Sequence, residues 1–112
     1  IVNELELKLE KKEFKNARLY LKLRKYEAAI VTLEDFIKEF PGSSFQEEAF
    51  FLTIKTAHDY AQASIRSVQN KRFKSCVDKY QTFVDKYPNS NFLKEAEEYY
   101  VNCTDFLSKF DV

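Results

Sequence analysis

The side chains best suited to chemistry in this chain of 112 residues are one histidine and two cysteines. A Ser or Cys nucleophile needs a nearby base that a third group holds in place. His58 is the only candidate base, and Asp59 is its neighbour in sequence, so on a helix the two side chains are expected to point to different sides. We therefore expect no catalytic residue, and a packing or surface role for His58.

The two cysteines do not indicate a metal site. Cys76 and Cys103 have neither CxxC nor another metal-ligand spacing, and no second histidine supports zinc. The sequence therefore predicts no metal and no cofactor. The thiols could form a disulfide in an oxidising compartment. We favour two buried free thiols, because Cys76 occupies a small core position where a thiol packs well.

Composition limits the fold class and the kind of partner. Lys plus Arg and Asp plus Glu each number 18, and this zero net charge argues against nucleic-acid binding. One Gly and two Pro are too few for the many turns of an all-β fold, so a few long helices are expected. Apolar runs such as Ala28–Val31 are far too short to span a bilayer.

The two prolines align an internal repeat. FPGSSF at residues 40–45 matches YPNSNF at residues 87–92, and the offset between the two prolines is 47 residues. A fixed period of this size is typical of stacked helical pairs. Tetratricopeptide units have about 34 residues and HEAT units about 40–47, so the period alone favours HEAT.

The pattern within the first unit favours the tetratricopeptide instead. Tyr20 follows Ala17 by three residues, Ala29 follows Tyr20 by nine, and Pro41 follows Ala29 by twelve. Small residues at these places let two helices cross closely, and the aromatic ring fills the groove beside them. In the second unit the offset places Ser64 and Ser67 at the positions of Ala17 and Tyr20.

Apolar periodicity predicts an all-α, tetratricopeptide-like superhelix of about five helices. The expected helices are about 3–24, 26–40, 44–68, 70–87 and 91–110. The third is extended to roughly six turns, which would explain the long period. Residues 1–112 are expected to form a single repeat domain, with units at about 4–42 and 45–89 and a closing helix at 91–110.

Boundary signals accompany these helices. Pro41 lacks an N–H and Gly42 accepts positive φ, so the pair should end the second helix. Ser44 with Glu47 resembles a capping box that begins the third helix, and Ser90 or Asn91 caps the fifth. The inward face of the first helix is expected to carry Leu5, Leu9, Phe14, Ala17, Tyr20 and Leu21.

Three segments resemble the BamD family, the outer-membrane lipoproteins of the β-barrel assembly machinery. They are EFKNARLYLKLRKYEAAI at 13–30, FPGSSFQEEA at 40–49 and YPNSNFLKEAE at 87–97. The resemblance runs from about Glu4 to Cys103 and is nearest to the C-terminal half of the family. The long third helix and the basic connection from Arg66 to Lys74 resemble Bacteroidetes-type members.

The resemblance implies a protein-interaction scaffold at the periplasmic face of the outer membrane. The implied partner is the POTRA region of the barrel-forming protein, and the implied membrane attachment is an N-terminal lipid anchor absent from this chain. The chain begins at Ile1 and is expected to be a processed chain or a fragment without the family's N-terminal repeats. The alternative is a generic tetratricopeptide adaptor that binds a short peptide in the cell envelope.

Candidate contact residues lie at the basic turns and on the last helix. The basic connection could bind phospholipid headgroups or an acidic partner, but we favour a solvated connection. The last helix has no following repeat, so its outer aromatic rings could form a contact patch. The expected contacts are Arg24, Lys25, Arg72, Phe106 and Phe110. The same reasoning expects Leu7, Leu19 and Leu23 on the first helix to be uncovered.

Overall fold

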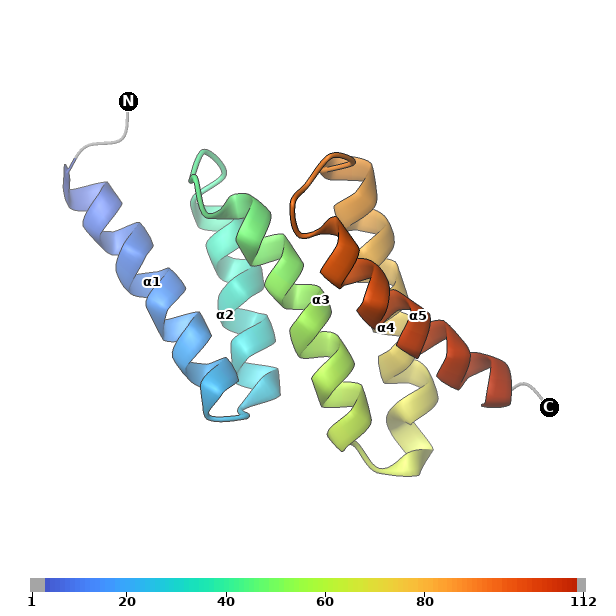
Figure 1. The fold of residues 1–112 in the computed structure, drawn as a ribbon. Coiled ribbons are helices and arrows are strands. Elements are labelled where there is room, and N and C mark those ends of the chain that lie inside the picture. Colours follow the sequence, from blue (N-terminus) through green and yellow to red (C-terminus); the bar gives the residue numbers. More distant parts are fainter. Residues whose placement is uncertain (1–3, 111–112) are drawn as a thin grey trace.

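The computed structural model describes residues 4–110, the last of them by its backbone alone, and this range contains five helices and no strand. The helices are α1 (Glu4–Lys22), α2 (Tyr26–Glu39), α3 (Gln46–Ala63), α4 (Arg66–Lys86) and α5 (Leu93–Phe110) (Figure 1). The predicted all-α, tetratricopeptide-like fold is therefore confirmed.

The helices stack as antiparallel hairpins in chain order, with α1–α2 beside α3–α4 and α5 closing the row (Figure 1). Each helix packs on the next in sequence, and α3 also contacts α5. The described chain measures 54 × 30 × 18 Å. Because a helix with its side chains is about 10–12 Å across, a thickness of this size corresponds to two layers of helices.

Small residues allow these helices to approach closely. Ala17, Ala29 and Cys76, which the spacing predicted to be buried, are all fully shielded from solvent. Further small residues of the core are Ala49, Ala57, Ala61, Ala96 and Cys103. Because a small side chain at a crossing lets two backbones come close, the larger rings beside it can fill the space that remains.

Two equivalent aromatic triads mark the repeat in three dimensions. The first consists of Phe14, Phe36 and Phe45, and the second of Phe51, Phe83 and Phe92. In each triad the ring on the first helix of the hairpin stacks on the ring that directly precedes the following helix, α3 or α5. The centroid separations of these stacked pairs are 4.9 Å and 4.8 Å, at interplanar angles of 13° and 14°.

The triads show where the long period arises. Phe14 and Phe36 are 22 residues apart, whereas Phe51 and Phe83 are 32 apart. The predicted six-turn third helix is wrong, because α3 has 18 residues, or about five turns. Most of the extra length lies in α4, which has 21 residues where α2 has 14. The α3–α4 hairpin is therefore longer between its triad rings, although α3 itself, with 18 residues, is slightly shorter than α1, with 19.

This extension also corrects the alignment of the second unit. Ser64 follows the last residue of α3 and Ser67 lies in the first turn of α4, so neither occupies a core position. Measured from the equivalent rings, the places of Ala17 and Tyr20 are taken by Ile54 and Ala57, which are both buried. The constant offset failed because the added residues fall inside the hairpin.

The connections before α3 and α5 each contain an equivalent hydrogen bond. Ser43 Oγ accepts from the Phe45 N–H at 3.0 Å, and Ser90 Oγ accepts from the Phe92 N–H at 3.0 Å. The capping box predicted for Ser44 is wrong, because the residue before α3 is Phe45 and no side chain caps it. The serine one position earlier closes the tight turn instead.

The ends of α1 and α2 use different devices. Helix α2 ends at Glu39, ahead of Pro41 as predicted, although Gly42 does not adopt the positive φ expected of it. The positive φ belongs to Arg24, at 60°. Lys25 N–H bonds to the Tyr20 carbonyl at 2.9 Å and Arg24 N–H to the Leu21 carbonyl at 3.0 Å, which is a Schellman motif.

The inward face predicted for α1 is only partly right. Phe14 and Ala17 are buried, but Leu5 and Leu9 are 77% and 47% exposed. Helix α1 is the first of the stack and packs mainly on α2, so its N-terminal turns are not covered from a second side. As expected, its outer leucines are exposed; these are Leu7, Leu19 and Leu23.

Candidate protein-interaction surfaces

His58 is part of the core between α3, α4 and α5. Its ring lies 4.9 Å from the Tyr99 ring and 6.4 Å from the Phe73 ring, measured between centroids. Nδ1 is 3.0 Å from Asp59 Oδ1, so the expectation that the two side chains diverge is wrong. The ring turns Nδ1 toward the neighbouring carboxylate, and Nε2 is buried without a hydrogen-bond partner among residues 4–110. This geometry supports a packing role.

The predicted basic contact residues lie at two hairpin turns. Arg24 and Lys25 are exposed at the α1–α2 turn. Arg72 is half-buried at the base of α4 and donates to Ser64 Oγ at 2.6 Å. The α1–α2 and α3–α4 turns lie at the same edge of the stack, the lower edge in Figure 1. We call this edge, with Arg24, Lys25 and Arg72, the basic edge.

An aromatic bridge joins the two turns of the basic edge. The Tyr26 and Tyr60 rings lie 6.0 Å apart between centroids, and the Arg72 guanidinium lies over the Tyr60 ring at 4.1 Å. The Arg72 side chain thus already has partners within the protein, whereas the side chains of Arg24 and Lys25 are exposed. These two residues are the stronger candidates for contact with a partner.

The aromatic residues predicted on α5 fare differently. Phe106 is half-buried and stacks on Phe73 with centroids 4.1 Å apart, so its ring mainly serves the packing of α5 on α4. The side chain of Phe110 lies outside the described residues.

A second surface, missed by sequence reasoning, lies between α1 and α3. It is a groove of about 480 Å³ that we call the cationic groove. Its lining is cationic or apolar apart from one amide, and consists of Lys15, Asn16, Arg18, Leu19, Leu21, Lys22, Leu52 and Lys55. Arg18 of this lining pairs with Glu48 at 3.7 Å. The groove would favour a partner with both apolar side chains and carboxylates.

Part of the cationic groove was visible in the sequence. Lys15, Arg18 and Lys22 are spaced i, i+3 and i+7, which places them on one face of a helix. Lys55 comes from α3 and joins them only because α3 packs beside the first hairpin. The helical spacing was a usable signal, whereas the fourth cation depended on the tertiary structure.

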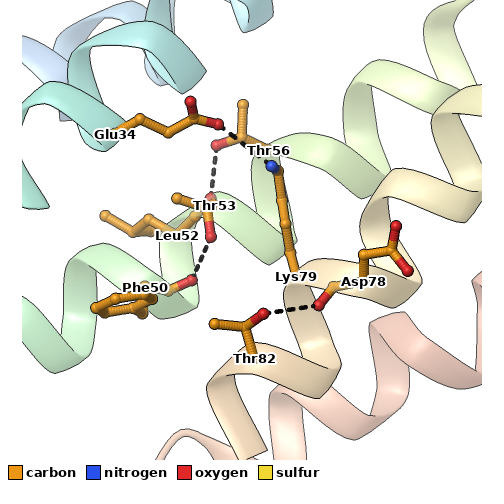
Figure 2. Close-up of polar contacts among 8 residues, drawn as sticks. All are labelled: Glu34, Phe50, Leu52, Thr53, Thr56, Asp78, Lys79 and Thr82. Carbon is orange, nitrogen blue, oxygen red and sulfur yellow. Dashed lines mark hydrogen bonds and ion pairs between the residues drawn. The ribbon is translucent and has the colours of Figure 1, made fainter. Parts of the chain in front are cut away.

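A third surface is the groove of about 410 Å³ lined by α2, α3 and α4. Lys79 Nζ of α4 reaches Glu34 Oε1 of α2 at 3.3 Å and thereby crosses it (Figure 2). Hydroxyl groups beneath the bridge are already bonded within their own helices. Thr53 donates to the Phe50 carbonyl at 2.6 Å and Thr82 donates to the Asp78 carbonyl at 3.1 Å (Figure 2). We call this surface the bridged groove.

Comparison with known proteins then identifies the family. Residues 7–112 match the family YfiO, described as an outer membrane lipoprotein. The chain belongs to this family. The match covers both hairpins and α5, and it confirms the resemblance to BamD at the level of the family. A search among curated proteins found no match.

Membership in the YfiO family makes the chain an outer-membrane lipoprotein of tetratricopeptide type. Among residues 4–110, no helix combines the length and the apolar character that a membrane span requires. In the same range, no three His, Cys, Asp or Glu side chains gather in a way that could hold a metal ion.

Proposed function

We propose that this chain is a non-catalytic scaffold in the assembly of outer-membrane β-barrel proteins. It would act at the periplasmic face of the outer membrane and hold the POTRA region of the barrel-forming protein. The observation that carries this proposal is the YfiO family match over residues 7–112. We propose further that it corresponds to the C-terminal half of a Bacteroidetes-type member and forms one repeat domain; the support for this is the resemblance of residues 13–30, 40–49 and 87–97 and the basic connection from Arg66 to Lys74.

The physical argument rests on stiffness and charge. Stacked hairpins with a continuous core keep their surface residues at fixed separations, so a partner can be bound without ordering the scaffold first. Arg24 and Lys25 at the basic edge and Lys15 and Lys22 in the cationic groove are exposed cations on this frame. An acidic partner surface would be attracted to either place, chiefly through the association rate.

Binding of the purified chain to a POTRA fragment, measured by biolayer interferometry, tests the proposal. The affinities of two double variants, Arg24→Glu/Lys25→Glu and Lys15→Glu/Lys22→Glu, are compared with that of a control variant, Lys11→Glu/Lys12→Glu. The last variant changes the charge equally at exposed α1 positions that do not line the groove. Loss of at least tenfold in affinity in one of the first two, with the control near wild type, supports the proposal.

Absence of binding by the wild-type chain to POTRA fragments at micromolar concentrations would overturn the proposed partner. An equal loss of affinity in all three double variants would show only a response to net charge and would count against a defined contact surface. Circular dichroism of each variant shows whether its helices are intact before the affinities are compared.

The alternative function is a tetratricopeptide adaptor that binds a short peptide. The bridged groove favours it, because about 410 Å³ between α2, α3 and α4 can take a few side chains. Glu34 and Lys79 would then have to part, since their ion pair crosses the groove. Binding of defined peptides that is weakened by Lys79→Glu, while POTRA binding is unaffected or absent, would favour this function.

A further inference from the structure

Two stacked ring pairs fix the register between α4 and α5. The Phe73 and Phe106 rings have centroids 4.1 Å apart at 29°, and the Tyr80 and Tyr100 rings have centroids 4.3 Å apart at 20°. From the first ring pair to the second, the residue number rises on α4, from 73 to 80, and falls on α5, from 106 to 100. The two helices are therefore antiparallel. Side chains between the two ring pairs must therefore meet at the same height along the helices.

Cys76 and Cys103 occupy those matched positions. Cys76 follows Phe73 by three residues and Cys103 precedes Phe106 by three, a spacing that keeps each cysteine on the face of its neighbouring ring. Both cysteines are free and fully buried. The neighbouring Cys103 side chain, through a hydrogen bond, and then burial raise the pKa of Cys76.

We propose that Cys76 and Cys103, for which the sequence favoured free thiols, form a disulfide that ties α4 to α5 in the protein at the outer membrane. The proposal rests on the family's location and not on the role in barrel assembly. Both the periplasm and the cell surface are oxidising, so facing thiols there tend to become oxidised. Antiparallel packing with small side chains at the crossing is compatible with the short Cβ–Cβ separation that a disulfide needs.

The bond forms by two thiol–disulfide exchanges with a disulfide oxidant. The thiolate of one cysteine attacks the oxidant, which makes a mixed disulfide and releases one sulfur as a thiol. The other cysteine then attacks its partner's sulfur, so the Sγ–Sγ bond forms and the second thiol of the oxidant leaves. The cysteines lose two electrons and two protons, and the oxidant takes up both.

Oxidation should precede complete folding. A buried thiol with a raised pKa holds little thiolate, and in the folded chain neither sulfur is accessible to an oxidant. Closure of α5 onto α4 would then seal the bond against reductants. The bond replaces the hydrogen bond between the two thiols and displaces a weak interaction in which Cys76 Sγ donates to the Ile54 carbonyl at 3.7 Å. That carbonyl is within α3, where the helical ladder continues to satisfy it.

The first experiment refolds the full chain from urea in a buffer with excess oxidised glutathione. The product is denatured, alkylated with a maleimide and weighed by intact mass spectrometry. We expect a monomer with no maleimide adduct, and two adducts after reduction. Cys103→Ser should give one alkylatable thiol after reduction. A folded monomer that retains two free thiols under these conditions would overturn the proposal.

The second experiment compares compartments. The chain is exported with a secretory leader, its thiols are trapped with acid and then alkylated, and the adducts are counted. No adduct is expected on the exported chain and two on the same chain made without a leader. Two adducts on the exported chain would overturn the disulfide even if the refolded chain oxidises. POTRA binding is measured separately, so its failure would not be confused with this result.

A stability measurement completes the test. The bond closes the loop between residues 76 and 103, so the melting temperature of the oxidised chain should exceed that of the reduced chain by about 10 °C or more. Cys76→Ala/Cys103→Ala provides the control, because its melting temperature should not respond to reductant. An oxidised chain that melts no higher than the reduced chain would count against the proposal, because the bond would then not stabilise the α4–α5 contact.

Discussion

The guanidinium of Arg72 lies over the Tyr60 ring, with Cζ 4.1 Å from the ring centroid. It also donates to Ser64 Oγ at 2.6 Å, so one side chain of α4 holds both the last turn of α3 and the residue after it. This contact closes the tip of the α3–α4 hairpin, the part that exceeds the first hairpin in length. The tip is therefore stabilised by the Arg72 side chain and not by a turn that contains glycine.

Arg72→Ala should lower the free energy of unfolding by about 1–2 kcal/mol, because it removes a cation–π contact and a hydrogen bond. Urea denaturation followed by circular dichroism measures this loss. Lys71→Ala is the matched control, since Lys71 is exposed and its removal should change stability by less than about 0.5 kcal/mol. Equal losses in the two variants would contradict the role given to Arg72.

Arg24→Gly should raise the free energy of unfolding by about 0.5–1 kcal/mol. Arg24 has a φ of 60°, and a Cβ in that region costs energy that glycine avoids. Arg24→Ala separates backbone from charge, because it removes the guanidinium but keeps the Cβ. If alanine stabilises the chain as much as glycine does, charge removal and not the left-handed backbone explains the gain.

Ser90→Ala should destabilise the chain more than Ser43→Ala. Both hydroxyls accept a backbone N–H at 3.0 Å in equivalent turns, but Ser90 also donates to Glu47 Oε2 at 2.7 Å. The additional charge-assisted bond should make the Ser90 variant worse by about 1 kcal/mol. A double-mutant cycle with Glu47→Ala tests this, and a coupling energy near zero would contradict it.

Tyr99 should make the chain less stable at alkaline pH. Burial is the main cause that raises the pKa of Tyr99 to about 12, and the Glu95 and Asp59 carboxylates add to it. The unfolded chain loses this proton near pH 10 and the folded chain only near pH 12. Stability from this group is thus complete below pH 10 and falls as pH rises toward 12.

Tyr99→Phe should remove this part of the alkaline loss. Urea midpoints at pH 9 and pH 11 are compared for the two proteins, because lysines also titrate in this range and cancel in the difference. The wild type should lose more stability than Tyr99→Phe between the two values. Parallel losses would show that the folded state does not hold the Tyr99 proton more tightly than the unfolded chain does.

Much of the architecture could be predicted because residues that pack between helices recur at regular intervals in the sequence. The burial of Ala17, Ala29 and Cys76 followed from the intervals between small residues, since close crossings recur at fixed spacings. The end of α2 ahead of Pro41 followed from the missing N–H. These signals are local, so a single chain segment contains all of the information.

Contacts between helices that share no local sequence pattern could be found only from the tertiary structure. Only the packed aromatic triads showed that the extra residues lie inside the α3–α4 hairpin, because a constant sequence offset cannot say where residues were added. The meeting of Cys76 with Cys103, and of Lys55 with the cations of α1, likewise depended on how helices are set side by side. Sequence periodicity indicated the buried faces of the helices, correctly at Phe14 and Ala17 but not at Leu5 and Leu9. The register between helices was decided by the fit of side chains across the contact.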